Sequence, residues 1–122
     1  MAANDYHVIV YQILAYLYSC LKDGVDVNLA SIEKFKEENL INDKYWQYIL
    51  IHLAECGYVE GLQTVPLLGG KQGVKCTTDF NITPFGIEYL LENSLMQKAK
   101  TLLLGAAKAT AGAILDRVLS VS

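Results

Sequence analysis

The sequence contains little arginine, cysteine or histidine, and each shortage counts against a class of protein. No arginine precedes Arg117, so the side chain that most often reads guanine is missing from most of the chain. Its three cysteines, Cys20, Cys56 and Cys76, form no CxxC pair, which is typical of a reducing compartment rather than a disulfide framework. With two histidines and no recognisable spacing of nucleophile and base, we expect a protein that is not an enzyme and needs no cofactor.

The sequence also lacks a long hydrophobic run. The longest candidate, Thr101 to Leu115, has fifteen residues with Lys108 in its middle, whereas a membrane-spanning helix needs about 20. Met1 to Asp5 do not resemble the basic and apolar start of a signal peptide. We therefore expect a cytoplasmic protein of 122 residues that has no membrane partner.

The charge of the chain is small and unevenly placed. The formal net charge is -3, which counts mildly against a general nucleic-acid binder. Residues 1–66 contain four lysines and nine acidic residues, whereas residues 67–122 contain six basic and four acidic residues. The basic excess thus begins where the turn-rich stretch PLLGGKQG, residues 66–73, predicts the tip of a hairpin.

Capping residues and hydrophobic spacing predict the order of the elements. Asparagines precede the first three helices, and glycine follows the first and the third. Two stretches rich in strand-forming residues flank the turn-rich segment. The predicted elements are helices Asp5–Asp23, Leu29–Glu38 and Asp43–Cys56, strands Tyr58–Val65 and Val74–Phe80, a short helix Pro84–Glu92, and a long helix from Leu95 onward.

The stretch NITPFGIEYLLENS, Asn81 to Ser94, predicts a junction between the hairpin and the last helix. Thr83 followed by proline is the start signal of the short helix. Gly86 is unfavourable in a first turn, so we expect a neighbouring backbone to pass close to it. Asn93 in a left-handed conformation would end the short helix, and Ser94 with Gln97 would form the capping box of the next.

A helix-turn-helix followed directly by a hairpin is the element order of a winged helix. ECGYVEG at Glu55 to Gly61 and ITPFGIEYLLENS at Ile82 to Ser94 resemble the two signature stretches of the YjcQ family, small winged-helix proteins of bacteria and their phages. The resemblance implies an α+β, mostly α, winged helix-turn-helix with a two-stranded wing and a long C-terminal helix. It implies no catalytic or ligand residues. We divide the chain into a winged-helix domain, residues 1–93, and a C-terminal helix, residues 94–122.

By analogy with the fold, double-stranded DNA is the predicted partner, and a transcriptional regulator is the predicted function. The third helix would enter the major groove, and the wing would reach the backbone or the minor groove. Asp43 and Glu55 on the same helix count against this hypothesis, and the alternative is a protein-interaction adaptor that does not bind DNA. The predicted DNA-binding residues are Asn42, Lys44, Gln47, Tyr48, Lys71, Gln72 and Lys75.

A metal site is the weakest candidate in the sequence. His52 and Cys56 are four residues apart on one helix face, a spacing that allows two metal ligands. The favoured interpretation is that Cys56 is a small core residue and that His52 is exposed.

The tail predicts a homodimer, because its helix is apolar on both a bulky side and a flat side of small residues. A second stripe on the first helix is also apolar and has no evident cover, so we expect the tail to pack on the first helix of a second subunit. A core helix or a docking site for another protein are the alternatives. The predicted dimer residues are Tyr11, Ala15, Tyr18, Leu104, Gly105, Ala109, Gly112 and Leu115.

Overall fold

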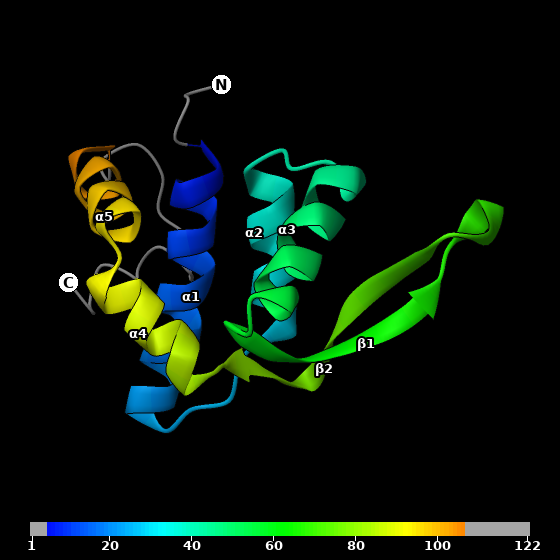
Figure 1. Cartoon of the computed structure of the whole chain (residues 1–122), viewed down its shortest axis with the longest axis horizontal. Helices are drawn as coiled ribbons and strands as arrows, with labels where there is room; N and C mark the ends of the chain where they lie inside the picture. The colour runs from blue at the N-terminus through cyan, green and yellow to red at the C-terminus, as the bar shows by residue number, and fades with distance from the viewer. Residues whose placement is uncertain (1–4, 107–122) are drawn as a thin grey trace.

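A computed structural model describes residues 5–106 of the chain and shows five helices with one projecting hairpin (Figure 1). The two strands form an antiparallel sheet that extends away from the helical body, and α4 and α5 lie on the opposite side of that body. The elements are α1 (Asp5–Asp23), α2 (Leu29–Glu38), α3 (Asp43–Glu55), β1 (Val59–Pro66), a 3-10 turn η1 (Leu68–Gly70), β2 (Gln72–Ile82), α4 (Pro84–Glu92) and α5 (Ser94–Ala106).

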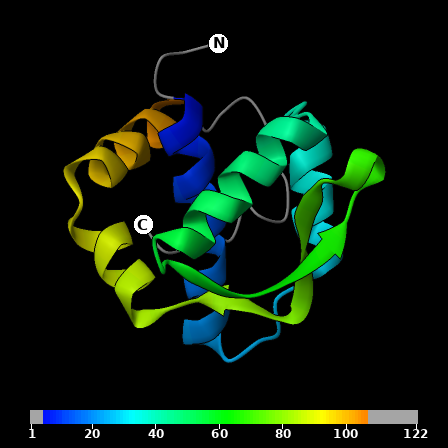
Figure 2. The same ribbon diagram turned by 45° about the vertical axis from the view of Figure 1, so that its right-hand side comes forward.

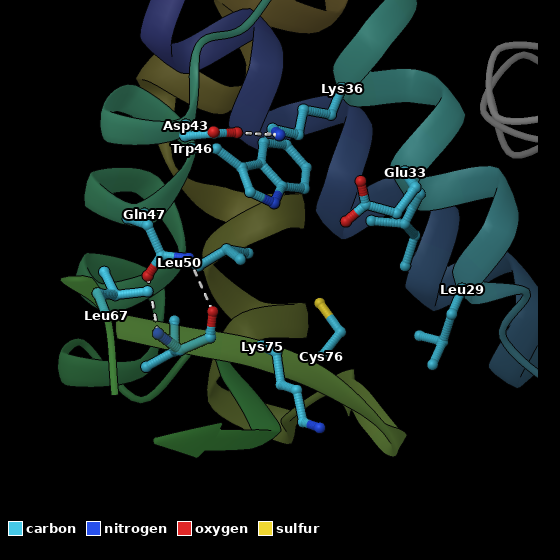
Figure 3. A pocket seen from close by; sticks show the side chains of 12 residues that line it. Leu29, Glu33, Lys36, Asp43, Trp46, Gln47, Leu50, Leu67, Lys75 and Cys76 are labelled. Atoms are coloured by element: carbon cyan, nitrogen blue, oxygen red, sulfur yellow. Dashed lines mark hydrogen bonds and ion pairs between the residues drawn. The ribbon is translucent and has the colours of Figure 1, made fainter. Parts of the chain in front are cut away.

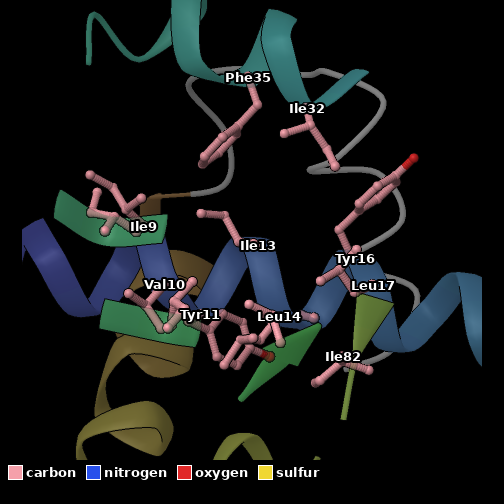
Figure 4. Close-up of a cluster of buried hydrophobic side chains, with 14 of the residues drawn as sticks. Ile9, Val10, Tyr11, Ile13, Leu14, Tyr16, Leu17, Ile32, Phe35 and Ile82 are labelled. Atoms are coloured by element: carbon pink, nitrogen blue, oxygen red, sulfur yellow. The ribbon is translucent and has the colours of Figure 1, made fainter. Parts of the chain in front are cut away.

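Helix α1 forms the centre of the core, because the other helices and the sheet pack around it. Every residue from Ile9 to Leu17 is buried, so this helix has no solvent-exposed face along two and a half turns. Figure 4 shows Ile32 and Phe35 of α2 on one side of α1 and Ile82 of β2 on the other. The alternation of polar and apolar residues that a surface helix shows is therefore absent here.

The prediction of a spare stripe on α1 is wrong for Tyr11 and Ala15. Both residues are buried within this single chain, at 4% and 0% exposure. Helix α5 of the same chain packs against α1, and α4 packs against it as well. Packing within the chain thus covers Tyr11 and Ala15, and of the three residues of the stripe only Tyr18 stays half-buried.

The predicted caps of α2 and α3 are confirmed. Asn28 Oδ1 accepts from the Ser31 amide at 3.2 Å, and Asn42 Oδ1 accepts from the Tyr45 amide at 2.8 Å. Each bond satisfies one of the amides that a first helical turn leaves without a partner. Leu21, near the end of α1, is 49% exposed, because the last turn of that helix extends past the packed part of the body.

Gly86 confirms the close backbone approach that its position predicts. A Cβ atom there would overlap the carbonyl oxygen of Tyr58, which itself accepts from the Thr83 amide at 3.0 Å. Thr83 caps α4 as predicted, since its Oγ1 accepts from the Gly86 amide at 3.0 Å and Pro84 follows it. The start of β1 and the start of α4 are therefore joined without space for a side chain between them.

The prediction for the boundary between α4 and α5 is wrong in its details. Asn93 has φ -72° and ψ 132°, an extended conformation and not a left-handed one. Its side chain caps α5, because Oδ1 accepts from the amides of Leu95 at 2.9 Å and Met96 at 3.3 Å. Gln97 donates to the carbonyls of Leu90 and Leu91 instead of closing a capping box with Ser94. One asparagine thus ends α4 and begins α5.

The hairpin is divided by a bulge into a base and an outer wing (Figure 2). At the base, Val59 pairs with Ile82 and Glu60 with Asn81, whereas the outer ladder resumes only at the pair of Leu62 with Cys76. The extra residues of β2 lie opposite Gly61, whose carbonyl accepts from Thr77 Oγ1 at 2.6 Å. A bulge bends its strand, and this one directs Phe80 into the core while the outer wing projects from the body.

Candidate nucleic-acid interface

The outward face of α3 carries the first group of predicted DNA-binding residues. Lys44 and Tyr48 are both exposed, and Tyr48 has 53% of its surface free. Its ring lies 4.1 Å from the His52 ring and makes an edge contact with Tyr6 of α1, so its position is supported from two sides. Asn42 is exposed as well, but its side-chain oxygen is used in the cap of α3.

Gln47 does not have the role that its place on α3 predicts. Its Oε1 accepts from the Val74 amide at 2.7 Å, and its Nε2 donates to the Val74 carbonyl at 2.8 Å. The Gln47 side-chain amide thus bonds to the edge of β2 that is not paired with β1, and both of its polar atoms have a protein partner. In this conformation they are not free for the predicted contact with DNA. We name this pair of bonds the Gln47–Val74 bridge.

The bridge depends on Gly73. A Cβ atom at this position would lie 2.9 Å from Gln47 Oε1 and 2.7 Å from Leu67 Cδ1. Only glycine leaves space for the side chain of α3 to approach the strand. The bridge holds the outer wing against α3, so the helix and the wing form one unit.

The wing presents its predicted residues to solvent. Lys71 and Gln72 lie next to the tip, and Lys75 follows on β2, all three exposed. The tip itself turns through Gly69 and Gly70, with φ of 83° and 76°. Lys71 and Lys75 of the wing and Lys44 of α3 are thus exposed positive charges.

Two acidic side chains near the start of α3 have partners within the chain. Asp43 on α3 forms an ion pair with Lys36 of α2, and this contact is the first cause of the raised pKa of Lys36. Tyr45 donates to Asp5 at 3.2 Å, and burial followed by the Asp5 carboxylate raises the pKa of Tyr45 to about 12. Glu55 stays exposed at the far end of α3. The acidic residue nearest the start of α3 is therefore paired with a lysine.

The interpretation of His52 and Cys56 is reversed in the structure. Cys56 is exposed and His52 is partly covered, with Nδ1 2.8 Å from the Tyr48 carbonyl oxygen. Residues 5–106 contain no cluster of three or more histidine, cysteine, aspartate or glutamate side chains that could hold a metal ion. His52 therefore supports the position of Tyr48, and within residues 5–106 neither His52 nor Cys56 belongs to a set of three metal ligands.

A second surface, not predicted from the sequence, lies where the hairpin base meets α4. The rings of Phe85, Tyr58 and Tyr89 stack in this order, with centroid separations of 5.5 Å and 4.1 Å. Glu88 and Glu92 border the same hollow of about 250 Å³. Burial is the main cause of the raised pKa of Tyr89, about 12, and the pKa of Tyr58 is raised for the same reason. We name these five residues the aromatic–acidic surface.

The predicted dimer residues are only partly described. Leu104 is 44% exposed on α5, and Gly105 lies in the same helix. Tyr18 lies under Lys22, whose Nζ is 5.2 Å from the ring centroid. Ala109, Gly112 and Leu115 fall outside the described residues.

This chain is a winged-helix protein, because α1, α2 and α3 are followed directly by an antiparallel hairpin that is bonded to α3. Its sequence matches the YjcQ protein family over residues 11–108, and the chain therefore belongs to that family. No curated protein and no solved structure gave a match. Within residues 5–106, no helix combines the length and apolar character that crossing a membrane requires.

Proposed function

We propose that this chain is a winged-helix protein that binds double-stranded DNA, without enzymatic activity, and acts as a transcriptional regulator. The observation that supports this proposal is the Gln47–Val74 bridge, because it holds an exposed helix face and a basic wing in one orientation. A helix and a wing so held can contact adjacent parts of a duplex at once. Lys44 and Tyr48 would face the major groove, and Lys71, Gln72 and Lys75 would lie along the backbone.

Selection of bound duplexes from a random pool at low salt tests this function directly. The affinity of the selected duplex should fall steeply with salt, because each lysine that meets a phosphate releases counterions. Changing Lys44 and Lys75 to alanine together should reduce the slope by about two units. Lys98→Ala is the matched control, since Lys98 is exposed on α5, away from the wing. Absence of any enriched duplex, or an equal loss in the control, contradicts the proposal.

The aromatic–acidic surface favours a second function, a protein-interaction adaptor. Phe85 is 57% exposed although it is a large apolar residue, and two carboxylates lie beside it. Such a surface suits an arginine or lysine side chain of a partner, which can stack on the ring and pair with a carboxylate. Affinity capture with wild-type protein and with Phe85→Ser as bait separates the two functions. A partner lost only with Phe85→Ser, together with no enriched duplex, supports the adaptor.

A homodimer is the assembly that we propose for either function. Leu102 and Leu104 are both 44% exposed on α5, and the sequence that follows is rich in small apolar residues. Since Tyr11 and Ala15 are covered by the chain itself, the contact would use the outer side of α5 and the tail. Sedimentation of the full chain tests this assembly, and a monomer at high micromolar concentration contradicts it.

A further inference from the structure

A cleft of about 340 Å³ lies between α2, α3 and β2, directly behind the Gln47–Val74 bridge (Figure 3). This volume is at the lower end of the range that small-molecule sites occupy. Ile32, Trp46 and Leu50 are core residues, and the sides of them that face the cleft form its apolar floor. Val74 and Cys76 of β2 form the opposite wall.

The Trp46 indole offers a hydrogen bond to this cleft. Its Nε1–H group is a donor only, and it has no acceptor among residues 5–106. Figure 3 shows the nitrogen edge of the ring directed into the cleft. A ligand with an acceptor atom can therefore bond here without displacing a protein group.

The Glu33 carboxylate faces the same space. Figure 3 shows it extending from α2 toward Trp46 and Cys76, and no ion pair holds it among the described residues. Its charge is felt inside the cleft, because burial and then Glu33 raise the pKa of the Cys76 thiol to about 12. The thiol therefore stays neutral, and Glu33 acts electrostatically on the β2 wall of the cleft.

Among residues 5–106 neither lysine at the rim forms an ion pair with Glu33, although Glu33 is one of the smaller causes of the raised pKa of Lys36. Lys36 is paired with Asp43 at one end of the cleft. The Lys75 side chain extends away from Trp46 at the other end. Among residues 5–106 the cleft thus combines an apolar floor, one carboxylate without an ion pair and one free donor.

We propose that this cleft binds a small amphipathic amine, with its ammonium group on Glu33, its apolar body on Trp46 and Leu50, and an acceptor atom on the Trp46 Nε1–H group. Such a ligand would also contact Val74 and Gln47, the two residues of the bridge. Binding would therefore stabilise the wing against α3. An effect on DNA affinity rests on the proposed function, whereas binding and wing stabilisation do not.

The test uses 2-phenoxyethylamine, which has an aromatic body, an ether oxygen and an ammonium group. Trp46 is the one tryptophan of the chain, so its indole N–H resonance in a nitrogen-15 correlation spectrum is unambiguous. For a probe of this size we expect a saturable shift of that resonance with Kd on the order of 1 mM. The Val74 amide should shift together with it and exchange more slowly with solvent. The matched probes are 2-phenoxyethanol, which is neutral, and phenoxyacetate, which is an anion.

Glu33→Gln should weaken the amine about tenfold, the loss expected for one charge-assisted hydrogen bond. Glu37→Gln is the matched control, because Glu37 is exposed one turn further along α2, and it should bind as the wild type does. Equal binding of phenoxyacetate, unchanged affinity in Glu33→Gln, or no saturable shift at about ten times the expected Kd overturns the proposal. No DNA is present in this experiment, so its failure is distinct from a failure of the proposed function.

Discussion

The base and the tip of the hairpin both contain glycine with positive φ, but only at the base would a Cβ atom collide with backbone. At the base, a Cβ atom on Gly61 would overlap the backbone of Asp79, and one on Gly86, in the first turn of the adjoining α4, would overlap Tyr58. At the tip, Gly69 and Gly70 have positive φ, and a Cβ atom on either would meet nothing within 4 Å. The base therefore needs glycine for close packing, whereas the tip needs it only to turn the chain. We call the closely packed base of the hairpin the rigid joint of the wing, and we call its open tip the tolerant end.

The largest effect is expected at Gly61. Gly61→Ala adds a methyl group that collides with backbone and also keeps φ at 84°, so we expect a loss of about 3 kcal/mol in the free energy of unfolding. Denaturant unfolding followed by circular dichroism measures it. Gly69→Ala is the matched control, with the same sign of φ and open space, and it should cost about 1 kcal/mol. Equal losses would remove the distinction between base and tip.

The Gln47–Val74 bridge extends the rigid joint along the outer wing. Gln47→Ala leaves the Val74 amide and carbonyl without their partner, so we expect a loss of about 2 kcal/mol in stability. Hydrogen exchange at the Val74 amide should accelerate more than exchange in α1. Gln63→Ala on the exposed side of β1 is the control and should change neither quantity. Unchanged exchange at Val74 in Gln47→Ala would show that the wing is held by other contacts.

Thr83 connects the base of the hairpin to α4, and its effect should be smaller. Thr83→Ala removes the cap of α4, for which we expect a loss of about 1 kcal/mol in stability. Thr78→Ala, at an exposed position of β2, controls for the loss of a threonine in this region. If the melting temperatures of Thr83→Ala and Thr78→Ala agree, the cap of α4 does not contribute to the stability of the joint.

The smallest effect is expected at the tip. Leu68 is 99% exposed, and its replacement by serine removes no packed surface, so stability should change by less than about 0.5 kcal/mol. Thermal melting measures this difference. A large loss would show that the tip packs on something in solution, and the view of the tip as a tolerant end would then be wrong.

The errors in the sequence-based predictions are concentrated where one side chain serves two elements. Asn28, Asn42 and Thr83 were identifiable because each cap bonds to an amide three residues away. Asn93 was assigned the wrong conformation, because ending α4 and capping α5 are both compatible with asparagine at that position. Gln47 was misread for a related reason, since its partner is 27 residues away along the chain. No local pattern could reveal that contact.

The aromatic–acidic surface and the cleft behind the wing were missed from the sequence. Tyr58 and Phe85 are far apart in the chain, and the spacing of aromatic residues gives no sign that their rings stack. Taken alone, Glu33 looks like an ordinary surface charge of α2, and Trp46 looks like an ordinary core residue of α3. They form a candidate site only because β2 closes the space between α2 and α3.

The sequence by itself determined the order and the approximate bounds of the elements, because caps, turns and hydrophobic spacing act within one or two helical turns. It also determined that Gly86 must lie against another backbone, since a glycine in a first helical turn costs stability without such a reason. Only the tertiary structure decided which faces stay exposed. It buried Tyr11 and Ala15 within the chain, and it joined Gln47 of α3 to Val74 of the wing. Burial and long-range hydrogen bonds depend on which elements pack against each other, and local sequence patterns do not specify those contacts.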